Sequence, residues 1–243
     1  MDSTTATGSQ QLSPERLDER LQLLTGNRIE DHLTRLDTIA AALDRVWAGI
    51  MLNSKLPLKT VMICGATPGE GASFLSFYLA LFLVRKYGLK VLYVDMAAGA
   101  PPNVTKYVDG LSSEAVNHHP LASLVVTTGV PGFSILPAGI HSPPENHSTA
   151  LAQKYSLEEL IRFCSDNFDI AIFDGQPILQ DPSTVTLAKL VEQVFLVCRY
   201  GRSRREVSKH ALDKLSANGV QVAGAILNQR EYPVPGHIYD SIR

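Results

Sequence analysis

The feature that most constrains this chain is a glycine-rich loop between an apolar run and an amphipathic segment. Residues 61–65, Val-Met-Ile-Cys-Gly, indicate a buried strand, and residues 74–85 indicate a helix. A strand, a glycine-rich turn and a helix start in this order direct backbone N–H groups at a phosphate. The loop at residues 66–73, Ala-Thr-Pro-Gly-Glu-Gly-Ala-Ser, fits the phosphate-binding P-loop pattern except that Ala72 stands where the pattern has lysine.

The missing lysine matters for catalysis. In P-loop proteins this side chain supplies the main positive charge that contacts the phosphoryl group during its transfer. One such pair contributes on the order of 4 kcal/mol before desolvation, at about 4 Å and an effective dielectric constant of about 20. Lys59 begins the strand and is predicted near the opposite edge of the sheet, while Lys86 lies roughly 20 Å along the helix. Neither lysine is expected to reach the loop.

Length and composition predict one sizeable core and a cytoplasmic protein. The chain has 243 residues, of which 45% are hydrophobic and 19% are charged, as in many single α/β domains. Its net charge of −2 gives no global basic field, so we expect no nucleic-acid partner. No signal peptide opens the chain, and no apolar run approaches the ~20 residues that span a bilayer. Any membrane association is therefore expected through a partner.

Four segments are predicted along the chain. Residues 1–13, rich in Ser, Thr, Gln and Gly, are expected to be disordered. Residues 14–57 are predicted to form N-terminal helices, the first of which ends at Gly26. Residues 58–230 are predicted to form a P-loop NTPase-like domain, and residues 231–243 a short C-terminal tail.

Apolar residues recur at steps of three and four along the second predicted helix, residues 27–52. The recurring residues, here called the apolar seam, are Ile29, Leu33, Leu36, Ala40, Leu43, Trp47 and Ile50. The seam runs over about three heptads and is narrower than the buried face of most globular helices. Two interpretations stay open from the pattern: the helix packs on its own sheet, or it pairs with another chain.

Buried strands alternate with helices through the rest of the chain. Strands are predicted at residues 89–95, 133–137, 168–174, 194–198 and 220–228, and helices at residues 157–163, 184–192 and 204–218. This alternation predicts an α/β fold with a doubly wound, mostly parallel sheet and helices on both faces. Ligands of such sheets bind beyond the carboxyl ends of the strands, so the loop, Asp95, Asp174 and Asn228 should meet at one edge.

Two strand-end aspartates suggest a metal site beside the loop. An aspartate opposite a P-loop Ser or Thr holds Mg²⁺ together with phosphate oxygens and waters. Ser73 and Asp174 fit that role if a nucleotide binds, with Asp95 as a second or water-orienting carboxylate. Strand-end aspartates also cap turns, and that alternative stays open for both.

Three arginines follow the strand predicted at residues 194–198. Arg202, Arg204 and Arg205 either lean over the phosphate edge or are solvated at the start of the next helix. We favour the solvated interpretation, because charged side chains are mostly exposed.

The region from residue 59 to residue 228 resembles the cytoplasmic domain of bacterial tyrosine kinases of capsular and exopolysaccharide export. These kinases belong to the wider deviant-Walker group that includes the MinD and ParA ATPases. The matching segments are residues 66–71, 91–95, 131–139, 168–174, 176–181 and 224–228. The resemblance implies a P-loop NTPase fold that binds ATP or ADP with Mg²⁺. It implies nucleotide contacts at Gly69, Glu70, Gly71, Ala72, Ser73, Phe74 and Asn228.

Several positions depart from the family pattern. Ala72 replaces the P-loop lysine, and Thr67 replaces the additional lysine of MinD proteins. Ala97 replaces a second aspartate, and Gly99 and Ala100 replace an arginine pair. Arg45 is the remnant of a Glu-x-x-Arg-x-x-Arg assembly motif, and Tyr232 and Tyr239 are what is left of a tyrosine-rich tail. The resemblance therefore implies a degenerate, pseudokinase-like member. Asp95 and Asp174 would then be vestigial, with no catalytic residues, and ATP or ADP would bind weakly.

The resemblance implies a role in bacterial exopolysaccharide synthesis and export, of the capsule, holdfast or cellulose type. The partner implied is a membrane-embedded co-polymerase or synthase subunit, which would hold the protein at the inner face of the cell membrane. We expect this partner, or a second copy in a homo-oligomer, to cover the apolar seam of residues 27–52. On this view Leu36→Asp with Leu43→Asp leaves the protein folded.

Two alternative functions remain from the sequence. The chain could be an active ATPase or tyrosine autokinase of the same pathway, with a substitute cation from Arg202, Arg205, Arg230 or a neighbouring subunit. It could also be a MinD- or ParA-like positioning ATPase, which Thr67 and Ala72 disfavour because they remove both lysines of that group.

Overall fold

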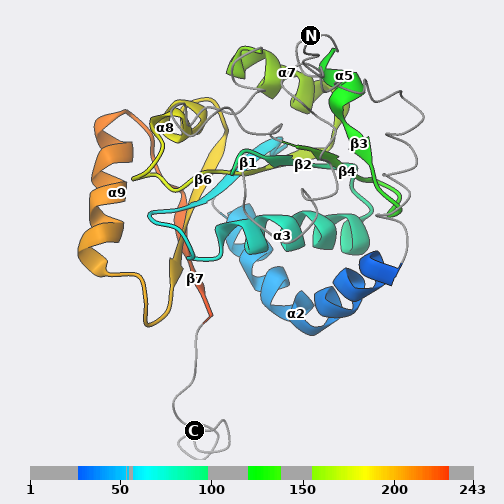
Figure 1. Cartoon of the computed structure of the whole chain (residues 1–243), viewed down its shortest axis with the longest axis horizontal. Helices are drawn as coiled ribbons and strands as arrows, with labels where there is room; N and C mark the ends of the chain where they lie inside the picture. The colour runs from blue at the N-terminus through cyan, green and yellow to red at the C-terminus, as the bar shows by residue number, and fades with distance from the viewer. Residues whose placement is uncertain (1–26, 53, 55–56, 98–119, 138–154, 230–243) are drawn as a thin grey trace, which may run out of the picture.

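The computed structural model describes residues 27–52, 54, 57–97, 120–137 and 155–229 (Figure 1). The segments predicted as a disordered N-terminus, a first helix and a C-terminal tail lie outside the described residues. So do Arg230, Tyr232 and Tyr239. Within the described residues, no helix combines the length and apolarity needed to cross a bilayer.

In the described part of the chain, seven strands form one sheet in the order β3-β4-β2-β5-β1-β6-β7. The strands are β1 (Thr60–Gly65), β2 (Val91–Asp95), β3 (Val126–Thr127), β4 (Phe133–Leu136), β5 (Ile170–Asp174), β6 (Gln193–Arg199) and β7 (Gly224–Asn228). All pairings are parallel except the antiparallel pair β3–β4. Every residue of β1, β2 and β5 is buried, as expected for strands covered on both faces. The predicted doubly wound, mostly parallel sheet is confirmed.

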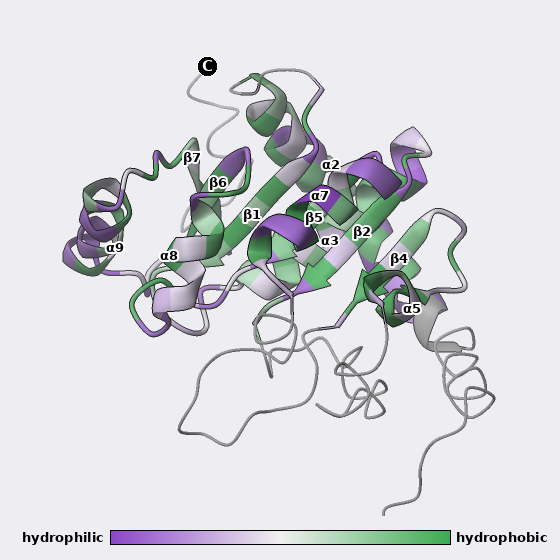
Figure 2. Ribbon diagram, turned by 90° about the horizontal axis from the view of Figure 1, so that it is seen from above, coloured by the Kyte–Doolittle hydropathy of each residue, from purple (hydrophilic) through white to green (hydrophobic). Residues whose placement is uncertain are grey.

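Helices cover both faces of the sheet (Figure 1). They are α2 (Asn27–Leu52), α3 (Ala72–Tyr87), α5 (Leu121–Leu124), α7 (Leu157–Asn167), α8 (Pro182–Ala188) and α9 (Arg205–Ala217). Figure 1 shows α2 and α3 on one face and α7 on the other, with α9 beside β6 and β7. Figure 2 shows the central strands in green and most of α9 in purple, so hydrophobic residues concentrate in the sheet.

Helix α3 is buried on all sides, which corrects the amphipathic helix predicted after the loop. Ten consecutive residues, 75–84, are buried. A helix that is apolar all round must be covered on every side. The sheet covers one side of α3, and α2 packs against α3.

From Leu33 to Ile50, the apolar seam of α2 is covered by the chain's own helix α3, so the expectation that a partner covers it is wrong. Leu36, Leu43, Trp47 and Ile50 are 2%, 2%, 8% and 1% exposed and belong to the main hydrophobic core. The apolar surface that α3 presents on the side away from the sheet is the physical reason. Association of a partner with other residues of α2 stays a prediction.

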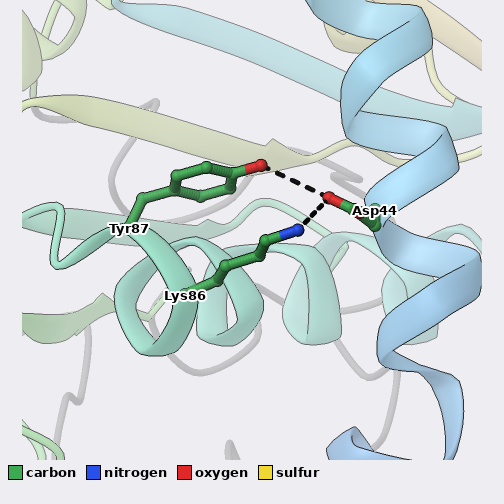
Figure 3. A network of polar contacts seen from close by, with 3 residues as sticks. All are labelled: Asp44, Lys86 and Tyr87. Carbon is green, nitrogen blue, oxygen red and sulfur yellow. Dashed lines mark hydrogen bonds and ion pairs between the residues drawn. The ribbon is translucent and has the colours of Figure 1, made fainter.

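Polar contacts fix the position of α2 on α3. The carboxylate of Asp44 accepts hydrogen bonds from the Lys86 ammonium and the Tyr87 hydroxyl at the end of α3 (Figure 3). Nearer the other end of α2, Nδ1 of His32 lies 2.9 Å from the hydroxyl of Tyr78. Lys86 is thus engaged far from the loop, as predicted.

Candidate functional site

Two glycines give the loop between β1 and α3 its shape. Gly69 and Gly71 have φ of +81° and +89°, in the left-handed region that favours glycine. Gly71 is also the N-cap of α3, and a Cβ at this position would lie 2.1 Å from Nδ2 of Asn228. The loop therefore leads from the carboxyl end of β1 directly into a helix start, as the sequence predicts for a phosphate site.

The side chain of Glu70 points into the protein and stabilises the loop by hydrogen bonds. It is 3% exposed, and its Oε2 accepts hydrogen bonds from the backbone N–H groups of Ala66, at 2.6 Å, and Thr67, at 3.2 Å. Its Oε1 accepts a hydrogen bond from Oγ of Ser203 at 2.6 Å. Both oxygens of the Glu70 carboxylate are therefore hydrogen-bonded within the protein. Glu70 can bind a ligand through its backbone N–H group.

Asn228 and Arg199 hold the outer side of the loop. Nδ2 of Asn228 donates to the carbonyl of Glu70 at 3.0 Å, and Nη1 of Arg199 donates to the carbonyl of Gly69 at 3.3 Å. Asn228 is predicted from the sequence, whereas Arg199 is not. A signal for Arg199 was its place at the carboxyl end of a strand, but the sheet order, which places β6 next to β1, was needed to use it.

Of the three arginines considered from the sequence, the structure brings Arg202 to the loop. Its Nη1, Cζ and Nη2 atoms lie 3.5, 3.6 and 3.6 Å from the position of a Cβ on Gly69. Arg204 and Arg205 are exposed at the start of α9. Arg202 is exposed as well, so it is solvated and lies against the loop at the same time.

Asp95 and Asp174 are adjacent and buried at the ends of β2 and β5. They are 2% and 0% exposed, and the strand register pairs them directly. Oδ2 of Asp174 accepts a hydrogen bond from the Tyr93 hydroxyl at 2.9 Å. Oδ1 of Asp95 accepts one from the backbone N–H of Ala97 at 3.0 Å, the turn-capping contact considered from the sequence.

Burial makes both carboxyl groups hold their protons more tightly. It raises the pKa of Asp174 to about 7, with the charge of Asp95 as the next cause and the hydroxyl of Ser73 opposing both. Burial likewise raises the pKa of Asp95 to about 6, against the hydrogen bond from Ala97. The charged forms of the pair are thus disfavoured in the folded protein unless a cation joins them.

The residues predicted to hold Mg²⁺ fit that ion. The hydroxyl of Ser73 interacts with the carboxyl group of Asp174, whose Oδ1 has no hydrogen-bond partner among the described residues. A carboxylate oxygen and a hydroxyl oxygen are ligands that Mg²⁺ accepts, with phosphate oxygens and waters completing its octahedron. No group of three or more His, Cys, Asp or Glu side chains suited to a metal occurs in the described ranges. A metal here would therefore depend on the oxygens of a second ligand.

No lysine in the described part of the chain donates a hydrogen bond to the loop. Nζ of Lys59 donates to the carbonyl of Phe168 at 3.1 Å, at the amino end of β5. Nζ of Lys214 donates to the carbonyl of Ile178 at 2.7 Å. The prediction that Lys59 and Lys86 do not reach the loop is confirmed.

The raised pKa values predict that the protein loses stability as the pH rises. An acid with a raised folded pKa contributes stability below its unfolded pKa, near 3.8, and loses it as the pH passes the folded value, about 7 for Asp174. Asp174→Asn keeps an oxygen for Tyr93 and removes the charge. Thermal melts at about pH 8 should show Asp174→Asn above the wild type by at least about 2 °C, the shift that roughly 1 kcal/mol gives at this chain length.

Asp213→Asn is the matched control, because Asp213 is exposed on α9. Its melting temperature should follow that of the wild type at every pH. Parallel pH profiles for the wild type and Asp174→Asn would contradict the prediction.

Comparison with known proteins supports the family resemblance. No family model matches the sequence. The tyrosine-protein kinase etk of Escherichia coli K12 is 28% identical over 172 residues, covering 69% of this chain and 23% of that protein. The tyrosine-protein kinase YwqD of Bacillus subtilis is 28% identical over 178 residues, covering 72% of this chain and 73% of that protein. The chain thus spans under a quarter of the length of etk and most of the length of YwqD.

Solved structures give the same answer for the fold. The kinase domain of Escherichia coli ETK matches with a TM-score of 0.65 and 25% identity, covering 80% of this chain and 78% of that one. The VpsO kinase domain matches with a TM-score of 0.67 and 24% identity, covering 83% and 98%. The MinD protein of Pyrococcus horikoshii, at a TM-score of 0.55 and 18% identity over 76% and 77% of the two chains, shares the P-loop fold alone. The relatives matched in sequence and the kinase domain of ETK are bacterial tyrosine kinases, so the chain is similar to that family and shares its P-loop NTPase fold.

Proposed function

We propose that the protein is a non-catalytic or nearly inactive member of this family that serves bacterial exopolysaccharide synthesis and export as an accessory. The observation that carries the proposal is a loop with the shape of a phosphate site but no lysine. Ala72 stands at the lysine position, and Lys59 and Lys86 are both bonded elsewhere. Phosphoryl transfer depends on positioning and on stabilising the charge of the transferred group. A site without that cation retains binding more readily than catalysis.

The second departure in the site supports the same proposal. Ala97 stands where the resemblance implies a second aspartate, and here its backbone N–H caps Asp95. Asp95 is thereby bonded within its own turn. The site thus lacks the carboxylate that the resemblance implies at position 97.

The accessory role requires a partner, and we propose a membrane-embedded polysaccharide co-polymerase or synthase subunit. The apolar seam is not available to it, because α3 covers the seam. A partner of α2 would meet its outer face, where Ala42, Arg45 and Ala48 are exposed, and its last residue, Leu52, which is 86% exposed. The protein would in this way reach the inner face of the cell membrane without an anchor of its own in the described residues.

One observation favours the alternative of an active autokinase. Arg199 and Arg202 bring two guanidinium groups to the loop, and either could act on a bound phosphate. The alternative of a MinD-like positioning ATPase has only the shared fold in its favour, since Thr67 and Ala72 occupy both of its lysine positions.

Genetic complementation separates an accessory from an enzyme. In the bacterium that encodes the protein, deletion should lower exopolysaccharide output, and Asp174→Asn should restore output as well as the wild-type gene does. The reason is that a role based on binding a partner does not need a carboxylate that acts on a phosphoryl group. Output is measured as secreted polysaccharide per cell, with immunoblots to confirm equal protein levels. A folded Asp174→Asn protein that behaves like the deletion would refute the accessory role.

A further inference from the structure

The peptide groups at the tip of the loop are oriented by their outer hydrogen bonds. The carbonyls of Gly69 and Glu70 point to Arg199 and Asn228. In a trans peptide the carbonyl and the following N–H point in opposite directions. The N–H groups of Glu70 and Gly71 therefore point away from these two side chains, to the inner side of the loop.

Four backbone N–H groups in succession are open to an anion. Within the described residues, no acceptor is bonded to the N–H of Glu70, Gly71, Ala72 or Ser73. The last two begin α3, where N–H groups lack partners within the helix and the helix dipole is positive. Such a set suits the oxygens of a phosphate.

The guanidinium group of Arg202 lies flat on the loop. Its Nη1, Cζ and Nη2 atoms are 3.5 to 3.6 Å from the place of a Cβ on Gly69, and such nearly equal distances mean that the plane of the group faces that point. No carboxylate among the described residues pairs with Arg202, which is exposed. The carboxylate nearest in sequence to Gly69, that of Glu70, is already bonded to Ser203. The charge of Arg202 is thus free to act on a ligand.

A second, independent observation points to a ligand at the same loop. Oδ1 of Asp174 is fully buried and has no hydrogen-bond partner in the described residues, and Ser73 lies against the same carboxyl group. A buried carboxylate oxygen without a donor is costly, and a divalent cation would satisfy it. A ligand that brings both phosphate oxygens and a bound divalent cation fits the N–H groups and Asp174 together.

We propose that Arg202 supplies the positive charge that Ala72 lacks, so that the loop binds the phosphates of a nucleotide with Mg²⁺. The inference rests on the proposed function in one respect, that this loop is a binding site. A planar guanidinium donates two parallel hydrogen bonds to phosphate oxygens, which suits binding. It approaches from the β6–α9 turn instead of from α3, so it does not occupy the position of the P-loop lysine. Binding and catalysis are thereby separated at this site.

Isothermal titration calorimetry with Mg·ADP tests the proposal. The wild type should bind with a Kd near the millimolar range, and Arg202→Ala should weaken binding by about fivefold to tenfold, the size of a charge-assisted contact at an exposed site. Arg202→Lys should retain part of the affinity, because a lysine keeps the charge and loses the paired geometry.

Arg205→Ala is the matched control, because it removes the same charge three residues away from an exposed position at the start of α9. Its Kd should stay within about twofold of the wild type, since an exposed charge that makes no contact with the ligand is largely screened by solvent and salt. Equal losses for Arg202→Ala and Arg205→Ala would overturn the proposal. So would a wild type that binds neither Mg·ADP nor inorganic phosphate at about 10 mM, some tenfold above the expected Kd.

These outcomes are distinct from a failure of the proposed function. Rapid ATP turnover would refute the accessory role and leave the binding role of Arg202 in place. Absent binding would refute the role of Arg202 and leave a non-catalytic accessory in place.

Discussion

Incubated with ATP and Mg²⁺, the purified protein is expected to release phosphate and to phosphorylate tyrosine only at background rates. Loss of one preorganised donor to a transition state costs roughly 10²- to 10³-fold in rate. Ala72 removes such a donor, and Ala97 removes a carboxylate that the family pattern places beside the reaction. Turnover should therefore lie at least roughly a thousandfold below the 1–100 s⁻¹ typical of kinases. A coupled assay for ADP and an immunoblot for phosphotyrosine measure the two activities.

Two variants make this expectation sharper. Asp174→Asn should leave the background rate unchanged, because the proposed function needs no catalysis by that carboxylate. Ala72→Lys should tighten nucleotide binding without restoring phosphorylation, since Ala97 is unchanged. Turnover of about 1 s⁻¹ that disappears in Asp174→Asn would show that a substitute cation supports catalysis.

Leu36→Asp with Leu43→Asp is expected to unfold the protein. Both leucines are 2% exposed between α2 and α3. Each loses about 1.5–3 kcal/mol of apolar burial, and each new carboxylate adds the cost of burying a polar group without a partner, at least about 1–3 kcal/mol. The sum exceeds about 5 kcal/mol, which is comparable to the whole free energy of unfolding of a typical domain. Circular dichroism and thermal melts of the purified variant measure the loss.

Ala41→Asp with Ala48→Asp is the matched control for this pair. Both alanines are exposed on α2 and have the same seven-residue spacing as the two leucines. The control should fold and melt close to the wild type, since exposed substitutions usually change stability by no more than about 0.5 kcal/mol. If the leucine variant also kept a native melting transition, the packing of α2 on α3 would not be what holds α2 in place.

The sequence by itself determined the loop and the edge of the sheet where it lies. Gly69 and Gly71 mark conformations that other residues avoid, and apolar runs of strand length predict strands buried on both faces. The rule that parallel strands bring their carboxyl ends to one edge then placed Asp95 beside Asp174. These features are local or follow from topology, so they could be predicted without coordinates.

The identity of the surface that covers α2 could not be predicted in this way. The spacing of Leu36, Leu43 and Trp47 shows that one face of α2 is buried. The periodicity of apolar residues does not show which element or which chain packs against that face. The answer came from α3, whose residues 75–84 are all buried and need a second cover besides the sheet. The sequence of that helix is itself almost wholly apolar.

Only the tertiary structure decided which side chains serve the loop. Glu70 turns inward to Ser203, which is 133 residues away, and Gly69 accepts from Arg199, which is 130 residues away. Arg202 faces Gly69, whereas Arg205, three residues on, starts a helix and is exposed. Such choices depend on the sheet order, which sets β6 beside β1, and on the course of one turn after β6. Contacts between residues so far apart in the chain leave no periodicity in the sequence, and for that reason the fold alone determines them.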